Sequence, residues 1–132
     1  MKLFLTLMLA LLVAASSEGV VRATDTTVVD TDHGLEWQLA TPGMMRWRDG
    51  MNYCKELTLN DRSDWRLPSK AELELGSQLA DYFKKVEPVY YWTSTDYEPD
   101  REKSWLVHLL YGFVAYDNGG FSYFVKCVRT FK

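Results

Sequence analysis

The chain has 132 residues, a length that favours one domain, and 47% of them are hydrophobic. Its formal net charge is −3, and its only cysteines are Cys54 and Cys127. The sequence has no basic stripe of the kind that nucleic-acid partners require, so a nucleic-acid-binding protein is not expected.

The first segment has the pattern of an export signal rather than of a folded element. Lys2 gives a positive start, and Leu3 to Ala15 is almost entirely apolar. At 13 residues, this run is shorter than the roughly 20 that cross a bilayer. Small residues ending at Ala15 and at Ala23 both fit signal cleavage. The run therefore predicts a cleaved signal peptide with two candidate cleavage sites.

We expect residues 1–23 to be removed and residues 24–132 to form a single domain with no transmembrane segment. Cleavage there takes away Lys2, Glu18 and Arg22, which changes the net charge from −3 to −4. A domain this small is marginally stable without a crosslink. A periplasmic or secreted location is oxidising, so the two cysteines are expected to form a disulfide, with two buried free thiols as the alternative.

Two short strands and two helices are predicted in the first part of the domain. The strands are residues 27–30 and 35–38, and Asp30–Gly34 between them is read as a turn, although it imitates the opening of a calcium loop. Apolar residues spaced by three and four predict a helix over 46–57 with one buried stripe. Ser69-Lys70-Ala71-Glu72 is a capping box that opens a second helix, which pauses near Gly76 and resumes through Phe83.

The second part of the domain predicts strands. Residues 90–94 are aromatic and β-branched, residues 105–110 and 113–116 form a hairpin, and residues 121–129 close the meander after a turn at 117–120. Helices followed by a run of antiparallel strands indicate the α+β class. We expect two helices packed on small antiparallel sheets, with one disulfide.

Several segments together resemble a known family, the C-terminal domain of the Legionella collagen-like adhesin. The matching segments span residues 30 to 129: Gly34–Gln38, Met51–Cys54, Asp64–Pro68, Glu72-Leu73, Tyr91–Thr95 and Val125–Arg129. The resemblance implies a C-type-lectin-like fold, related to that of the formylglycine-generating enzyme, and pairing of Cys54 with Cys127. For the adhesin domain, it also implies trimers and a basic surface that binds sulfated polysaccharides. This chain differs in its negative mature charge and in having no collagen-like stretch.

Two loops, at residues 95–103 and 117–122, are the predicted recognition surface. Loops on a rigid sheet commonly carry binding residues, and Tyr and Arg suit such surfaces. The acidic and amide residues also imitate the two calcium-ligand sets of sugar-binding C-type lectins, so Ca²⁺ is an alternative to the expected absence of any cofactor or metal. The candidate ligand-binding residues are Tyr97, Glu98, Asp100, Arg101, Asp117 and Asn118.

Catalysis is not expected. His33 and His108 are the only histidines, and both cysteines are assigned to the disulfide. Trp65 is read as a core residue, and Arg66 as a structural partner of backbone carbonyls or of Asp64. The sequence therefore predicts an exported, non-catalytic module that binds a glycan or an envelope protein. A degenerate or metal-assisted enzyme and a structural envelope subunit are the alternatives.

Overall fold

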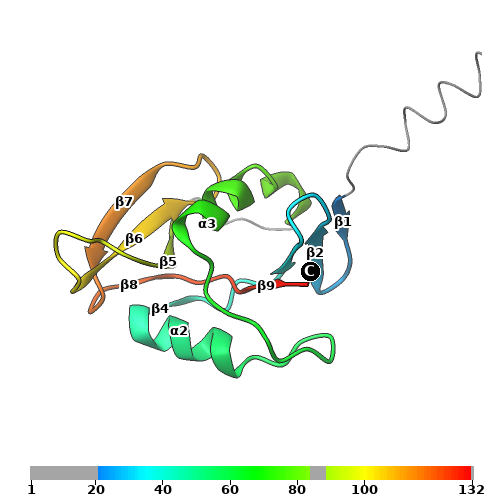
Figure 1. The fold of residues 1–132 in the computed structure, drawn as a ribbon, viewed down its shortest axis with the longest axis horizontal. Coiled ribbons are helices and arrows are strands. Elements are labelled where there is room, and N and C mark those ends of the chain that lie inside the picture. Colours follow the sequence, from blue (N-terminus) through cyan, green and yellow to red (C-terminus); the bar gives the residue numbers. More distant parts are fainter. Residues whose placement is uncertain (1–20, 84–88, 132) are drawn as a thin grey trace, which may run out of the picture.

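The computed structural model describes residues 21–83 and 89–131. Residues 1–20, which hold most of the predicted signal peptide, lie outside the described residues. The described part forms two sheets and two helices, confirming the α+β class (Figure 1). The C-type-lectin-like assignment remains an expectation from the resemblance. No helix within residues 21–83 and 89–131 is long and apolar enough to span a membrane.

The first sheet joins the two ends of the domain. It runs in the order β1 (Val21–Ala23), β2 (Thr27–Asp30), β3 (Leu35–Gln38) and β9 (Val128–Thr130), with every neighbouring pair antiparallel. The predicted turn at residues 30–34 is confirmed. The carboxylate of Asp30 accepts the backbone N–H of Asp32 at 3.1 Å, and Gly34 adopts φ 66°. The last strand therefore pairs with one of the first.

The second sheet has five strands. Its order is β4 (Met44–Arg46), β8 (Ser122–Phe124), β5 (Tyr90–Asp96), β6 (Lys103–His108) and β7 (Val114–Asn118). All pairs are antiparallel except β5 with β8, where Tyr91 lies opposite Phe124 in a parallel bridge. The sheet is thus mostly, but not entirely, the predicted meander.

The predicted closing strand at 121–129 is wrong as a single element. The chain leaves the second sheet after β8, passes through Val125–Cys127, and joins the first sheet as β9. Val125, Lys126 and Cys127 are completely buried, so this segment runs through the interior between the sheets. Because β8 pairs with β4 in the second sheet and β9 pairs with β3 in the first, the chain has to cross from one sheet to the other between Phe124 and Val128.

The two helices cover opposite faces of the second sheet. Helix α2 (Trp47–Glu56) agrees with the predicted helix, and α3 (Lys70–Ser77) is followed by the 3₁₀ turn η1 (Ala80–Tyr82), as the pause predicted near Gly76 requires. The capping box is confirmed: Ser69 Oγ accepts the Glu72 N–H at 3.2 Å, and Glu72 Oε1 accepts the Ser69 N–H at 2.9 Å.

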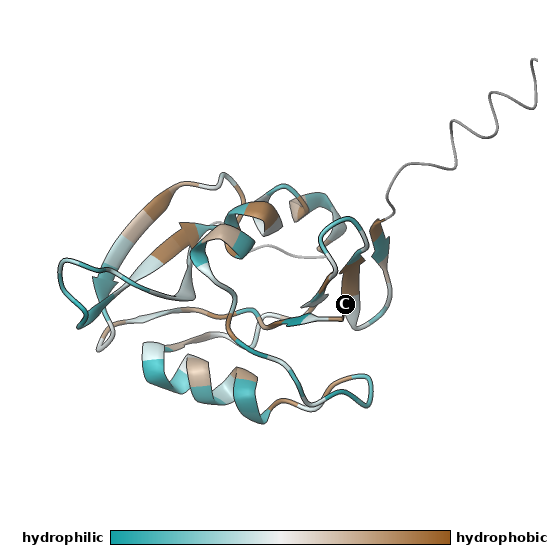
Figure 2. Cartoon of the chain, in the orientation of Figure 1, coloured by the Kyte–Doolittle hydropathy of each residue, from teal (hydrophilic) through white to brown (hydrophobic). Residues whose placement is uncertain are grey.

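Two hydrophobic clusters hold these layers together (Figure 2). The cluster between the sheets and α3 contains the buried residues Val28, Leu35, Trp37, Leu39, Leu73, Phe83, Tyr91, Val107, Leu109 and Val128. The cluster beneath α2 contains Cys54, Trp65, Leu67, Trp92, Leu106, Val125 and Cys127. Trp65 is therefore a core residue, as predicted, and its side chain is 3% exposed.

The Cys54–Cys127 disulfide is confirmed. It fastens the buried face of α2 to the segment that leads into β9, across a sequence separation of 73 residues. In the chain-entropy view, closing a loop of this length removes about 4 kcal/mol of unfolded-state freedom. The helix next to it is thereby fixed to the sheet region.

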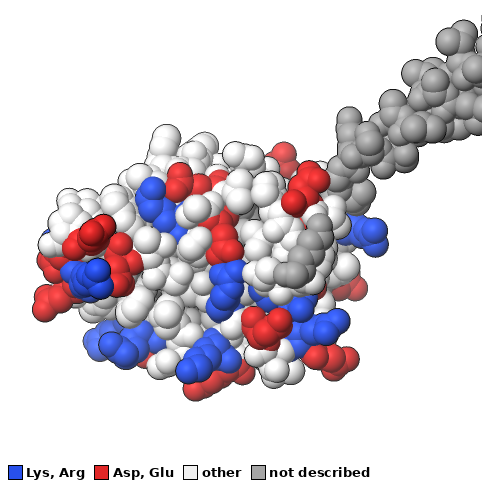
Figure 3. Space-filling model, in the orientation of Figure 1, with Lys and Arg blue, Asp and Glu red and all other residues white. Residues whose placement is uncertain are grey.

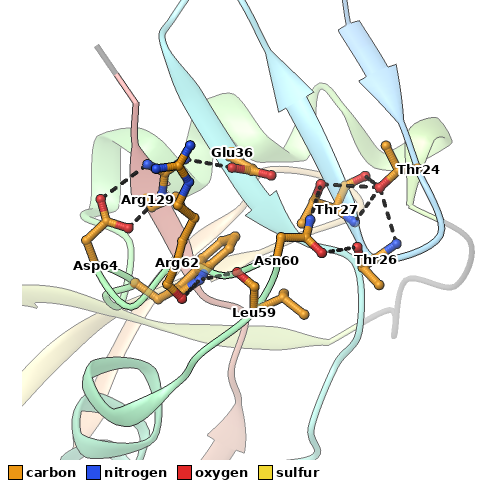
Figure 4. Close-up of polar contacts among 10 residues, drawn as sticks. Thr24, Thr26, Thr27, Glu36, Leu59, Asn60, Arg62, Asp64 and Arg129 are labelled. Carbon is orange, nitrogen blue, oxygen red and sulfur yellow. Dashed lines mark hydrogen bonds and ion pairs between the residues drawn. The ribbon is translucent and has the colours of Figure 1, made fainter.

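Polar side chains fix the loop between α2 and α3. Asn60 and Asp61 both have positive φ, 55° and 59°, and close a two-residue turn of the kind that favours Asn and Asp. Asn60 Oδ1 accepts the hydroxyl of Thr26 at 2.8 Å, which ties this turn to the first sheet (Figure 4). The loop is therefore anchored at its tip.

Arg129 anchors the same loop at its C-terminal end. Its guanidinium lies between Asp64 and Glu36, donating to one oxygen of each at 2.7 Å (Figure 4). This hydrogen bond to Arg129 is the main reason that the pKa of Asp64 is lowered. Asp64 thus pairs with Arg129 and not, as one of the sequence alternatives had it, with Arg66.

Candidate functional site

The two loops predicted to bind a ligand lie side by side at one end of the second sheet. The β6–β7 register places Lys103 opposite Asn118, and the Gly119 N–H donates to the Glu102 carbonyl at 3.1 Å. The loop after β5 and the turn after β7 therefore form one surface, seen at the left of Figure 1.

Two of the six candidate residues line one hollow on this surface. Arg101 and Asn118 border a hollow of about 440 Å³. The other lining residues are Trp47, Arg48, Glu102, Gly119 and Gly120. Asn118 Oδ1 accepts the Gly120 N–H at 2.8 Å, so part of its side chain is used to hold the turn.

Tyr97 belongs to an aromatic cluster instead. Its ring stacks on Tyr116 with 3.8 Å between centroids and an interplanar angle of 12°, and it meets Trp105 edge-on at 5.2 Å. The hydroxyl contact with Tyr116 is the main cause of the raised pKa of Tyr97. Tyr97 does not line the hollow beside Arg101.

The three acidic candidates do not converge. Asp100 Oδ1 accepts the Glu102 N–H at 3.2 Å within the loop, and Glu98 is exposed. Asp117 accepts the hydroxyl of Tyr123, which raises the pKa of Tyr123 to about 12. Within the described residues, no three His, Cys, Asp or Glu side chains are grouped so that they could hold a metal ion.

A second hollow continues from the first along α2. It measures about 420 Å³ and shares Trp47 and Arg48 with its neighbour. Its remaining lining residues are Met51, Asn52, Lys55, Trp65, Arg66, Leu67 and Ser94. We call the two hollows together the α2 groove.

The sequence of α2 explains the character of this groove. Arg48, Asn52 and Lys55 are spaced by four and three, so they share one stripe of the helix and all line the groove. Asp49 and Glu56 lie about a quarter turn further round and do not line it. The helix therefore presents its basic stripe to the groove. The sequence already contains this spacing, but the prediction used only the apolar stripe of the helix.

Trp47 holds the start of α2 in place at the junction of the two hollows. Its indole Nε1–H donates to the Thr93 carbonyl at 2.9 Å, and its backbone N–H donates to the Gly119 carbonyl at 3.1 Å. A Cβ added at Gly119 would lie 3.2 Å from the Cβ of Trp47. The floor of the groove is thus fixed to β5 and to the β7–β8 turn.

Arg66 forms the opposite wall and is itself held by Glu72. Its two terminal nitrogens donate to the two carboxylate oxygens at 2.7 and 2.8 Å, and one also donates to Thr130 Oγ1. The Arg66 hydrogen bond is the main cause of the lowered pKa of Glu72. The expected partners of Arg66, Asp64 or backbone carbonyls, are therefore wrong, although its structural role is correct.

The charge of the groove is opposite to that of the whole domain. Four basic side chains line it, Arg48, Lys55, Arg66 and Arg101. Arg66 is paired with Glu72, which leaves three basic side chains against the carboxylate of Glu102. Figure 3 shows basic side chains over α2 along the lower edge of this face, with acidic ones beside them, and mostly acidic side chains over the loop between β5 and β6 at the far left. The arrangement suits a ligand that carries negative charge.

Comparison with protein-family models identifies the family of this chain. No curated protein matches the chain. Among protein-family models, that of the Lcl C-terminal domain matches residues 26–129, which include both helices, the disulfide and both sheets except β1 and the last residue of β9. The chain belongs to the Lcl C-terminal domain family.

Proposed function

We propose that this protein is an exported, non-catalytic binding module of the cell envelope, and that it binds an anionic glycan in its α2 groove. The observation that carries the proposal is the composition of the groove, in which Arg48, Lys55 and Arg101 outnumber the one lining carboxylate, that of Glu102. The predicted signal peptide and the Cys54–Cys127 disulfide support a periplasmic or secreted location.

The geometry favours an extended ligand over a small one. The α2 groove consists of two adjoining hollows of about 420 and 440 Å³, joined at Trp47 and Arg48. Arg48 and Lys55 are exposed, and no ion pair within the described residues engages either of them. Their donors are available to sulfate or carboxylate groups spaced along a chain.

The lining also supports a glycan over an acidic protein as the ligand. Asn52 and Ser94 add hydrogen-bonding groups that suit sugar hydroxyls, and half-buried Trp47 provides an aromatic surface between them. Sulfated polysaccharide is also the ligand that the family resemblance implies for the adhesin. An acidic envelope protein is the second candidate, because the same basic side chains would suit it.

Binding of dextran sulfate and of unmodified dextran, measured by calorimetry on the mature protein, tests the proposal. We expect binding to dextran sulfate only, weakened at least tenfold in the double variant Arg48→Glu/Lys55→Glu. Arg62→Glu is the matched control for Arg48→Glu and Lys55→Glu made singly, because each of the three replacements changes the charge by the same amount and Arg62 is exposed outside the groove. Equal weakening by the control would assign the binding to overall charge, and no binding to dextran sulfate would overturn the glycan proposal.

A further inference from the structure

The turn between β6 and β7 exposes a cluster of apolar side chains at one end of the second sheet. Leu110, Tyr111, Phe113 and Val114 are exposed by 38, 65, 62 and 43%. The ring of Tyr111 stacks on that of His108 with 5.0 Å between centroids, and its centroid lies 5.7 Å from that of Phe113. The rings thus adjoin one another, and Leu110 and Val114 flank them in the chain. We call the four exposed residues the β6–β7 tip.

The area of the tip is that of an interaction site. Taking roughly 150–250 Å² per aromatic ring, Tyr111 and Phe113 alone expose about 200–300 Å². A continuous apolar surface of a few hundred Å² on one domain commonly marks a site of protein or membrane contact. Figure 2 shows the apolar part of β7 next to this turn, at the end of the sheet away from the loop between β5 and β6.

No charged side chain interrupts the hairpin around the tip. Residues 104–116 include no Lys, Arg, Asp or Glu, although 25% of the whole chain is charged. The two charged residues that bound this run are Lys103 and Asp117, at the other end of β6 and β7. At 3.3 Å per strand residue, Lys103 lies roughly 17 Å along β6 from His108. The tip therefore has no charged neighbour within its own hairpin.

The backbone of the turn is suited to an apolar environment. The Gly112 N–H donates to the His108 carbonyl at 2.7 Å, the His108 N–H to the Phe113 carbonyl at 2.7 Å, and the Tyr111 N–H to His108 Nδ1 at 3.3 Å. Gly112 adopts φ 77°, a left-handed conformation that glycine takes without strain. An unpaired N–H is costly in hydrocarbon, so internal bonding of these three donors favours entry of the turn into a bilayer surface.

We infer that the β6–β7 tip docks the protein onto a neutral phospholipid bilayer, with Tyr111 and Phe113 inserted at the level of the headgroups. Aromatic rings prefer this depth, and the hydroxyl of a tyrosine remains hydrated there. Leu110 and Val114 add aliphatic area that favours the same insertion. An uncharged tip suits a bilayer without net charge, because it offers no cation to anionic headgroups.

The side chains of the tip favour lipid over a protein partner. Specific protein interfaces surround an apolar centre with a polar rim and form about one hydrogen bond per 100–200 Å². Between Leu109 and Val114, the Tyr111 hydroxyl is the only side-chain group that donates or accepts hydrogen bonds. A bilayer takes up apolar side chains without such partners, so it fits this composition better.

The tip is separate from the glycan site. The hollow of the α2 groove that Asn118 and Gly119 line lies at the opposite end of β7 from the tip. A lipid surface at the tip therefore leaves this part of the groove open. The inference goes beyond the glycan proposal and does not depend on it.

Cosedimentation of the mature protein with phosphatidylcholine vesicles tests the inference. We expect the parent to bind and Phe113→Ser to bind at least tenfold more weakly, because the exposed part of this ring amounts to about 100–150 Å² of apolar surface. Phe121→Ser is the matched control. It makes the same replacement at a phenylalanine that is 59% exposed beyond the other end of β7, and it should bind as the parent does.

The groove variant Arg48→Glu/Lys55→Glu separates this inference from the proposed function. It should bind neutral vesicles as the parent does, even where it no longer binds dextran sulfate. Absence of parent binding to phosphatidylcholine vesicles, or equal weakening by Phe113→Ser and Phe121→Ser, would overturn the inference. Capture of an envelope protein that requires Phe113, without vesicle binding, would overturn it in favour of a protein partner.

Discussion

Lys126 offers the sharpest test of the energetics of this fold. Its side chain is completely buried, and its ammonium group donates to the carbonyls of Gln38, Leu39 and Ala40 at 2.8 to 3.1 Å. Burial away from water lowers its pKa from 10.5 to about 7. Between these two values the unfolded chain holds a proton that the folded protein has lost. The free energy of unfolding therefore rises with pH across this window.

The magnitude follows from that difference. One pKa unit corresponds to 1.36 kcal/mol, so raising the pH from 7 to 9 is expected to stabilise the parent by about 2 kcal/mol through this residue. Lys126→Met removes the titrating group and should remove this gain. The variant should also be less stable than the parent at pH 9, because two buried carbonyls lose a donor at about 1–3 kcal/mol each. The raised pKa of Tyr123, about 12, affects stability only above this range.

Urea unfolding at pH 7, 8 and 9, followed by tryptophan fluorescence, measures both effects. Lys55→Met is the control, since Lys55 is exposed and its loss should leave the pH dependence unchanged. The three carbonyl acceptors match the three donors of an ammonium group, and they oppose the effect of burial. If they keep Lys126 charged at pH 9, parent and Lys126→Met will show the same slope, and the reasoning fails.

Three further predictions concern the crosslink, the core and the mature end of the chain. Cys127→Ser should lower the free energy of unfolding by about 2–5 kcal/mol in urea titrations, and equal midpoints under oxidising conditions would contradict this. Gly76→Ala places a Cβ 2.9 Å from the Trp37 ring and should cost about 1–3 kcal/mol, read from the melting temperature. The pairing of Val21–Ala23 with β2 favours cleavage after Ala15 over the removal of residues 1–23 expected from the sequence, and the intact mass of exported protein distinguishes the two.

Local patterns predicted the parts of this fold that depend on nearby residues. The capping box needs only Ser69 and Glu72, three positions apart, and the Asp30 turn needs only its own five residues. Arg129 and Lys126 could not be read in this way. Their partners lie 65 to 93 positions earlier in the chain, at Asp64, Glu36 and the end of β3. Long-range polar partners follow from the tertiary fold, which the local pattern does not supply.

The candidate site shows the same division. Sequence reasoning located the loops that carry Arg101 and Asn118, since turn residues mark loops. It did not locate the wall of the groove formed by Arg48 and Lys55, because their helix was analysed for the stripe that it buries. Sequence reasoning also could not predict that the Tyr123 hydroxyl donates a hydrogen bond to Asp117, since the two residues lie on different strands.

The contrast between the net charge and the groove determines how ligand binding should be predicted for this domain. At physiological ionic strength, charges are screened over about 8 Å, so a bound anion senses mainly the side chains lining its site. Those are Arg48, Lys55 and Arg101 against Glu102, because Glu72 neutralises Arg66, and most other acidic residues of the mature chain do not line the groove. A negative total charge therefore does not argue against an anionic ligand. It does predict that lowering the salt, which lengthens the screening distance, will strengthen binding less than in a domain that is basic throughout.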